Sequence, residues 1–185
     1  VCNADERQSI KTALYLLLAG QLALRLYNPQ KLVPAPGSAE KGREIISQIE
    51  LASRHIRTPI IAVTGTNGKT TTVKLMAEIF RGAGRNIFLG GNVGTPLIEY
   101  VLHGHAAEFI IAEISSFQLE GIRTFRPFIS VLLNLQQDHL DRYSSYGEYI
   151  AAKARVFANQ QESDYALLNA DDVDVQKLSP SVRAT

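Results

Sequence analysis

The sequence has little cysteine and no excess of charge of one sign. Cys2 is its single cysteine among 185 residues, so a framework of disulfides within the chain is excluded and a reducing compartment is favoured. The 19 basic and 18 acidic residues give a formal net charge of +1. Because no long basic run interrupts this balance, we expect no nucleic acid as a partner.

Long hydrophobic runs are also lacking. The most apolar stretch lies within residues 13–27, and Gln21 and Arg25 interrupt it before it is long enough to span a bilayer. Asp5 and Glu6 stand where a signal peptide needs positive charge. We therefore expect an amphipathic or buried helix here, no association with a membrane, and a cytoplasmic protein.

From Pro59 onward, short apolar runs alternate with helical patterns. The expected strands are residues 60–64, 86–89, 109–112, 129–133 and 165–168, and the expected helices are residues 71–82, 96–102 and 146–158. This alternation predicts an α/β fold in which helices flank a mostly parallel sheet. Residues 1–57 lack this alternation and predict a short, partly helical N-terminal segment, with a helix over residues 38–55.

The most informative run is IIAVTGTNGKTT, residues 60–71, which predicts a buried strand that turns through glycines into a helix. Such a turn closes backbone N–H groups on phosphate, and the helix N-terminus adds positive potential. Only two residues separate its first glycine from the Gly-Lys pair, where the common phosphate-binding loop has four. We expect this loop to bind ATP through Gly65, Thr66, Asn67, Gly68, Lys69, Thr70 and Thr71, and name residues 65–70 the phosphate loop.

Polar clusters follow four of the expected strands, at residues 65–70, 90–94, 113–116 and 134–142. Ligands of open α/β sheets bind beyond the carboxyl ends of the strands, so these clusters are expected to line one edge. Glu113 is either a metal ligand or a solvated acid at a strand end. A carboxylate opposite the hydroxyl of a phosphate loop favours the first reading, because Mg²⁺ prefers hard oxygen ligands.

Two further residues carry possible chemistry. His139 lies in the polar run of residues 138–142, but loop histidines are usually surface residues and imidazole suits magnesium poorly. Lys153 lies in the apolar stripe of the expected helix over residues 146–158, whose start Ser145 defines as a cap. Such a lysine usually extends its amine to solvent, and the alternative is that burial keeps the amine neutral for covalent or base chemistry.

These motifs resemble those of the Mur ligases, the amino-acid-adding enzymes of peptidoglycan synthesis. The loop at residues 64–71 is similar in folylpolyglutamate synthases as well. The runs at residues 113–120 and 138–143 resemble the branch that adds D-glutamate, and residues 90–94 and 151–155 also fit. In matching order, the motifs cover roughly residues 58–173.

The resemblance implies a bacterial, monomeric ATP-dependent carbon–nitrogen ligase. It would join D-glutamate to UDP-N-acetylmuramoyl-L-alanine through an acyl phosphate, using ATP and two Mg²⁺ ions. The implied catalytic residues are Lys69, His139 and Lys153. The implied metal ligands are Thr70, Glu113, His139 and Lys153, the last as a CO₂-derived carbamate. Asn92, Ser115 and Gln118 match positions that contact the muramyl substrate.

The resemblance also predicts the domain organisation. Residues 1–57 would be a remnant of an N-terminal domain for the UDP-substrate, and residues 58–185 the central ATP-binding domain. We expect the C-terminal amino-acid-binding domain to be absent, and hence little activity from this chain alone. The alternatives are another Mur ligase, a folylpolyglutamate synthase, a P-loop NTPase switch and a non-catalytic nucleotide-binding fragment.

Overall fold

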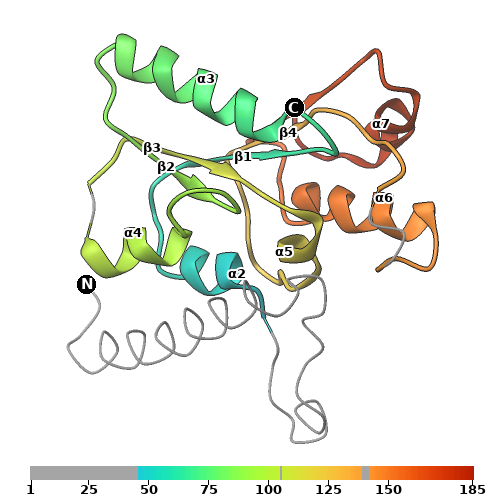
Figure 1. Cartoon of the computed structure of the whole chain (residues 1–185), viewed down its shortest axis with the longest axis horizontal. Helices are drawn as coiled ribbons and strands as arrows, with labels where there is room; N and C mark the ends of the chain where they lie inside the picture. The colour runs from blue at the N-terminus through green and yellow to red at the C-terminus, as the bar shows by residue number, and fades with distance from the viewer. Residues whose placement is uncertain (1–45, 105, 139–141) are drawn as a thin grey trace, which may run out of the picture. The chain divides into compact units, whose positions relative to one another are not determined.

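The computed structural model describes residues 46–104, 106–138 and 142–185 of the chain (Figure 1). Its strands are β1 (Ile60–Thr64), β2 (Ile87–Gly91), β3 (Phe109–Glu113), β4 (Ile129–Leu132) and β5 (Tyr165–Leu168). They form one sheet in the order β2-β3-β1-β4-β5, and every neighbouring pair is parallel. The predicted α/β fold with a parallel sheet is confirmed.

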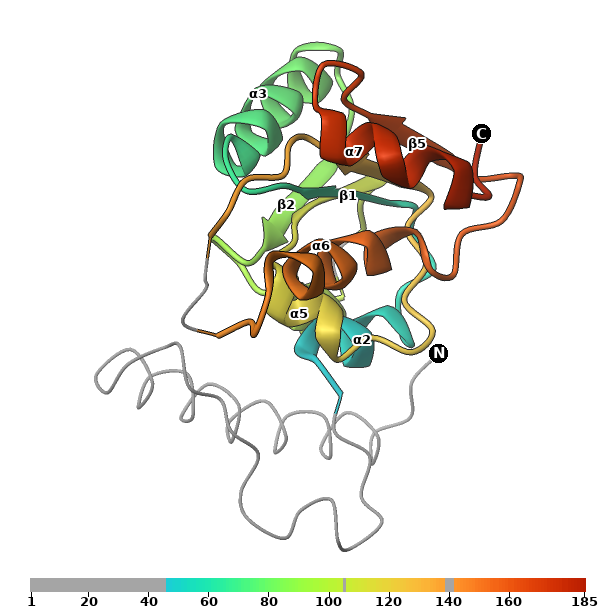
Figure 2. The same ribbon diagram turned by 90° about the vertical axis from the view of Figure 1, so that its right-hand side faces the viewer.

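Helices cover both faces of this sheet. The α-helices are α2 (Gln48–Ser53), α3 (Lys69–Gly82), α4 (Leu97–His103), α5 (Ser116–Glu120), α6 (Tyr146–Ala154) and α7 (Val173–Leu178). Short 3-10 turns follow α6 as η1 (Arg155–Phe157) and α7 as η2 (Ser179–Ser181). Figures 1 and 2 show α3 on one face and α2, α4, α5 and α6 on the other.

The helix predictions differ from the structure at α5 and α7, at the end of α6 and around α2. The sequence did not predict α5 and α7, which have five and six residues and so lack a readable helical period. The helix predicted over residues 146–158 ends at Ala154 and continues as η1. Of the helix predicted over residues 38–55, residues 46–55 are described, and only α2 is helical among them.

Residues 46–185 form one compact unit, whereas the domain boundary predicted at residue 57 stays a prediction. The stretch at residues 13–27 lies outside the described residues. In the part of the chain that the structure describes, no helix has the length and apolar character needed to cross a membrane.

The core explains why α3 starts at the carboxyl end of β1. All five residues of β1 are buried, as expected for a central parallel strand covered on both faces. Val73 and Ala77 of α3 pack in one cluster with Ile61, Val63 and Ile111 of the sheet. This packing holds α3 against the sheet and leaves its first turn at the rim where β1 ends.

Candidate functional site

The phosphate loop joins β1 to α3 and presents the helix N-terminus at the sheet edge. Gly68 is the N-cap of α3 and has a left-handed backbone with φ of 82°, which favours glycine because it has no Cβ. No side chain caps the first N–H groups of α3. A helix start without a side-chain cap can donate these N–H groups to an anion.

Two lysines meet on this loop. The Nζ of Lys69 donates to the carbonyl oxygens of Gly65 and Thr66, both at 2.9 Å. The Nζ of Lys153, from α6, donates to the same Gly65 oxygen at 2.8 Å. The structure therefore brings the two predicted lysines together, although 84 positions separate them in the sequence.

Lys153 does not extend its amine to solvent. The residue is only 2% exposed, and its Nζ lies 4.8 Å from the centre of the Tyr149 ring. Burial and then the nearby positive charge of Lys69 lower the pKa of Lys153 from 10.5 to about 7, while Asp138 acts in the opposite direction. Of the two alternatives that the sequence left open, the structure has the buried amine, which is partly neutral near pH 7.

Thr70 and Glu113 form a second pair at this edge. The Thr70 hydroxyl donates to Oε2 of Glu113 at 2.6 Å, and the side chain of Asn92 donates to Oε1 at 3.1 Å. Glu113 is 2% exposed, and both of these donors are neutral. A buried carboxylate beside a hydroxyl offers the hard oxygens that Mg²⁺ prefers, and a cation here would balance its charge.

No cluster of three or more His, Cys, Asp or Glu side chains forms a metal site among the described residues. The edge therefore does not resemble an all-protein metal cage. Magnesium usually keeps several waters and shares one or two carboxylates with substrate phosphates, and this pattern needs no such cluster. Thr70 and Glu113 fit an ion of this kind.

The remaining predicted residues are distributed as follows. Ser115, which lies two residues after β3, and Gln118 of α5 bond to each other as the capping box of α5, with the Ser115 N–H donating to Oε1 of Gln118 at 3.0 Å. Thr71 lies exposed in the first turn of α3. His139 lies outside the described residues, so its part in the site stays a prediction.

Three residues that the sequence did not single out as binding residues contact the loop. The Tyr149 hydroxyl lies 2.9 Å from the hydroxyl of Thr66, and Gln136 accepts a bond from the side chain of Asn67 at 2.9 Å. Asn134 also bonds to Asn67. Asn134 and Gln136 fall in the polar run after β4, which is a signal in the sequence for contact with the loop. Tyr149 gave no such signal, because it belongs to an apolar stripe.

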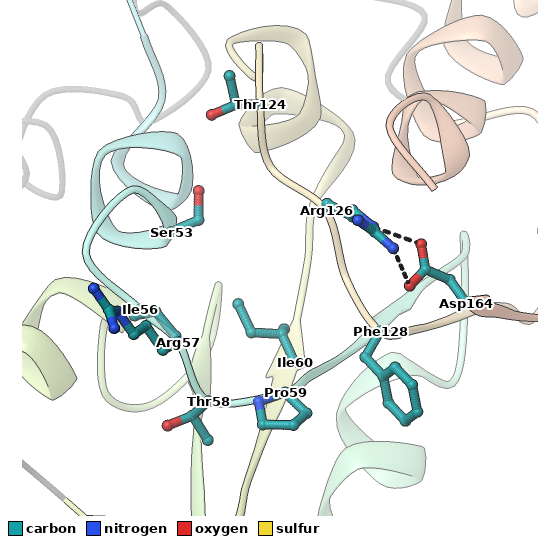
Figure 3. A pocket seen from close by; sticks show the side chains of 10 residues that line it. All are labelled: Ser53, Ile56, Arg57, Thr58, Pro59, Ile60, Thr124, Arg126, Phe128 and Asp164. Atoms are coloured by element: carbon teal, nitrogen blue, oxygen red, sulfur yellow. Dashed lines mark hydrogen bonds and ion pairs between the residues drawn. The ribbon is translucent and has the colours of Figure 1, made fainter. Parts of the chain in front are cut away.

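The cavity in Figure 3 is separate from this site. It has a volume of about 390 Å³ and lies where β1 and β4 begin, with Ile60 and Phe128 in its wall. Its charged wall includes Arg126 and Asp164, which pair through two bonds of 2.7 and 3.0 Å. None of the predicted site residues lines it, and the amino ends of parallel strands are not where such sheets bind ligands.

The comparison with known proteins agrees with this geometry. The family of the Mur ligase middle domain matches residues 63–183, a stretch that starts in β1 and includes all of the residues described at the edge. The UDP-N-acetylmuramoylalanine–D-glutamate ligase of Geobacter metallireducens is 52% identical over 157 residues, which are 85% of this chain and 35% of that protein. The enzyme of the same name from Pelobacter propionicus is 54% identical over 156 residues, again 35% of its length.

The chain thus spans about a third of the length of the curated relatives that it matches. Among solved structures, the MurF ligase from Thermotoga maritima in complex with ADP is similar with a TM-score of 0.62 and 23% identity, covering 75% of this chain and 35% of that one. The UDP-N-acetylmuramate:L-alanyl-gamma-D-glutamyl-meso-diaminopimelate ligase from Neisseria meningitides has a TM-score of 0.61 and 18% identity, covering 83% and 55%. These likenesses show the fold alone.

Proposed function

Because the chain belongs to the Mur ligase family, we propose that it is the ATP-binding part of a ligase that adds D-glutamate to UDP-N-acetylmuramoyl-L-alanine. The observation that carries this proposal is the edge where Lys69 and Lys153 meet on the phosphate loop and Thr70 meets the buried Glu113. The choice of D-glutamate rests on relatives of that name at about half identity.

The proposed reaction sets two anions against each other. A substrate carboxylate attacks the γ-phosphorus of ATP, so an acyl phosphate forms as the bond to ADP breaks. The amine of D-glutamate then attacks the acyl carbon, loses a proton and expels inorganic phosphate. The main barrier of the first step is charge repulsion, which positive groups fixed around the triphosphate would lower.

Residues of this chain would supply much of that positive field. The uncapped N–H groups of α3 would face the phosphates, and Lys69 would leave its two carbonyl partners to bind them. Thr70 and Glu113 would hold a magnesium ion, which supplies charge neutralisation and a template for the phosphates when it is bound. By the resemblance, His139 and Lys153 would hold a second one.

Lys153 would take part as a carbamate. The lone pair of the neutral amine forms an N–C bond to CO₂ and the nitrogen loses one proton, so the neutral amine becomes an anionic carbamate that offers oxygen ligands. This step needs a neutral amine, and burial lowers the pKa of Lys153 to about 7, which supports it. The carbamate would also remove the repulsion between Lys153 and Lys69.

The substrates would occupy the rim beside this site. Asn92, Ser115 and Gln118 are proposed contacts of the muramyl substrate, and the first of them bonds to Glu113 within the same edge. We propose a monomer located in the cytoplasm, where ATP and UDP-linked precursors are available.

Nucleotide binding tests the proposal directly. Calorimetry with ADP and Mg²⁺ should show binding by this chain, and Lys69→Ala should weaken it by at least about 10-fold because a charge-assisted phosphate contact is lost. Lys74→Ala is the matched control, since Lys74 lies exposed on the same helix. An affinity of Lys69→Ala equal to that of the native chain would contradict the proposal.

The carbamate has its own test. Incubation with isotope-labelled bicarbonate should give a carbamate signal in the carbon NMR spectrum, and Lys153→Arg should remove that signal because its guanidinium stays protonated. A signal that persists in Lys153→Arg would mean that the modification lies elsewhere.

A further inference from the structure

The side chain of Asn134 closes on the backbone of the phosphate loop. Its Oδ1 accepts the N–H of Asn67 at 2.8 Å, and its Nδ2 donates to the carbonyl oxygen of Asn67 at 3.1 Å. The carbonyl oxygen of Asn134 accepts the N–H of Thr66 at 3.0 Å. Asn134, which lies in the segment after β4, therefore holds two successive residues of the loop between β1 and α3.

The carboxylate of Asp172 holds the next residue of that segment. Its Oδ2 accepts the N–H of Leu135 at 2.8 Å, across 37 positions of sequence. Its Oδ1 accepts the N–H groups of Asp174 and Val175, both at 3.0 Å, as the N-cap of α7. Leu135 is buried, so its N–H has little access to water as a substitute partner.

We infer that Asn134 and Asp172 are positioning residues of the nucleotide site, a role that rests on the proposed ATP binding. Asp172 anchors the segment after β4 to the start of α7, and Asn134 in that segment fixes the peptide units of Thr66 and Asn67. Neither residue is needed to touch the nucleotide, since both act through the phosphate loop.

The physical reason is preorganisation. A phosphate loop binds through several backbone N–H groups at once, so any freedom that the loop gains must be lost again on binding. An asparagine at position 172 has one carbonyl oxygen and still caps α7 well, but it cannot also accept the Leu135 N–H. Asp172→Asn thus removes the bond to Leu135 and keeps the cap of α7.

The experiment measures ADP affinity in Mg²⁺ by calorimetry for the whole chain and its variants. Asn134→Ala and Asp172→Asn should each weaken binding on the order of 10-fold. The double variant should bind ADP no more weakly than the single variant of lower affinity, because Asp172 acts through the segment that contains Asn134. Gln161→Ala and Asp171→Asn, two exposed residues outside the polar clusters at the edge, are the controls and should bind as the native chain does.

Hydrogen exchange of the nucleotide-free chain provides a second readout. Peptides that cover the phosphate loop should exchange faster in Asn134→Ala and Asp172→Asn than in the native chain. In both controls their exchange rate should be unchanged. If Asn134→Ala does not fold, Asn134→Asp replaces it, because it keeps the acceptor for the Asn67 N–H and loses only the donor.

The outcomes separate this inference from the proposed function. If Lys69→Ala abolishes ADP binding while Asn134→Ala and Asp172→Asn bind as tightly as the native chain, the inference is wrong and the function stands. Additive losses in the double variant would also overturn it. If the native chain binds no ADP, the proposed function fails, and unchanged loop exchange in the variants would then reject the positioning role as well.

Discussion

The amine of Lys153 shows at the scale of one residue how the fold alters side-chain chemistry. Its register on α6 placed it in an apolar stripe, and in the structure the residue is buried. Burial, and then the charge of Lys69, lower its pKa to about 7. The folded chain thus holds this proton less tightly than the unfolded chain, so stability rises with pH between about 7 and 10.5.

Lys153→Met should remove this pH dependence. In CO₂-free buffer without nucleotide, the free energy of unfolding of the native chain should gain about 2 to 4 kcal/mol relative to the variant as pH rises through that window. Denaturant titrations at several pH values measure it, with Lys74→Met as a control that removes a lysine from an exposed site. A constant difference between native chain and Lys153→Met would show that the amine titrates alike in both states.

At the scale of the element, a buried carboxylate of α2 accepts several hydrogen bonds from the segment before β4. Glu50 accepts the N–H groups of Arg123, Thr124 and Phe125 at 2.9 to 3.0 Å, and the hydroxyl of Thr124 and Nε of Arg54 as well. Burial alone would raise the pKa of Glu50, but these bonds outweigh it and lower the pKa to about 2. The carboxylate therefore joins α2 to the segment before β4 in its ionised form.

Glu50→Gln should destabilise the chain by about 2 to 3 kcal/mol at neutral pH, because an amide turns an N–H group toward these donors. For the native chain, the contribution of Glu50 is present above pH 4.5 and is lost as pH falls toward 2. Thermal unfolding from pH 7 down to pH 3 measures both effects. Glu78→Gln on the exposed face of α3 is the control, and an equal loss in both variants would refute the assignment.

At the scale of the whole molecule, the site depends on how closely strand ends approach one another. Gly91 of β2 pairs with Glu113 of β3, and a Cβ at Gly91 would lie 2.2 Å from the Glu113 carbonyl oxygen. Its φ of +113° is also rarely adopted by residues with side chains. Glycine here allows the sheet edge to close on the carboxylate proposed to hold magnesium.

Gly91→Ala should therefore cost more stability than backbone strain alone, on the order of 3 kcal/mol or more, and should weaken Mg²⁺-dependent nucleotide binding. Gly94→Ala is the matched control, since its φ is +83° but its Cβ would meet nothing within 4 Å. It should cost about 1 to 2 kcal/mol. Equal losses in chemical denaturation would show that contact with the Glu113 backbone does not limit this position.

The local pattern of the sequence determined the elements and the loop. Apolar runs and helical periods predicted five strands and three of the helices within about two residues at most ends, because these features depend on neighbouring residues. Gly65 to Thr70 identified the phosphate loop for the same reason. The roles of His139 and of the muramyl contacts stay predictions.

Only the tertiary structure decided the strand order and the partners across the edge. Lys153 reaches Gly65 over 88 positions, Tyr149 reaches Thr66 over 83, and Asp172 reaches Leu135 over 37. No local period encodes such contacts, since they form only when separate strands end at one rim of the sheet. The same packing removes Lys153 from water, which is why its chemistry could be suspected from the sequence but not decided.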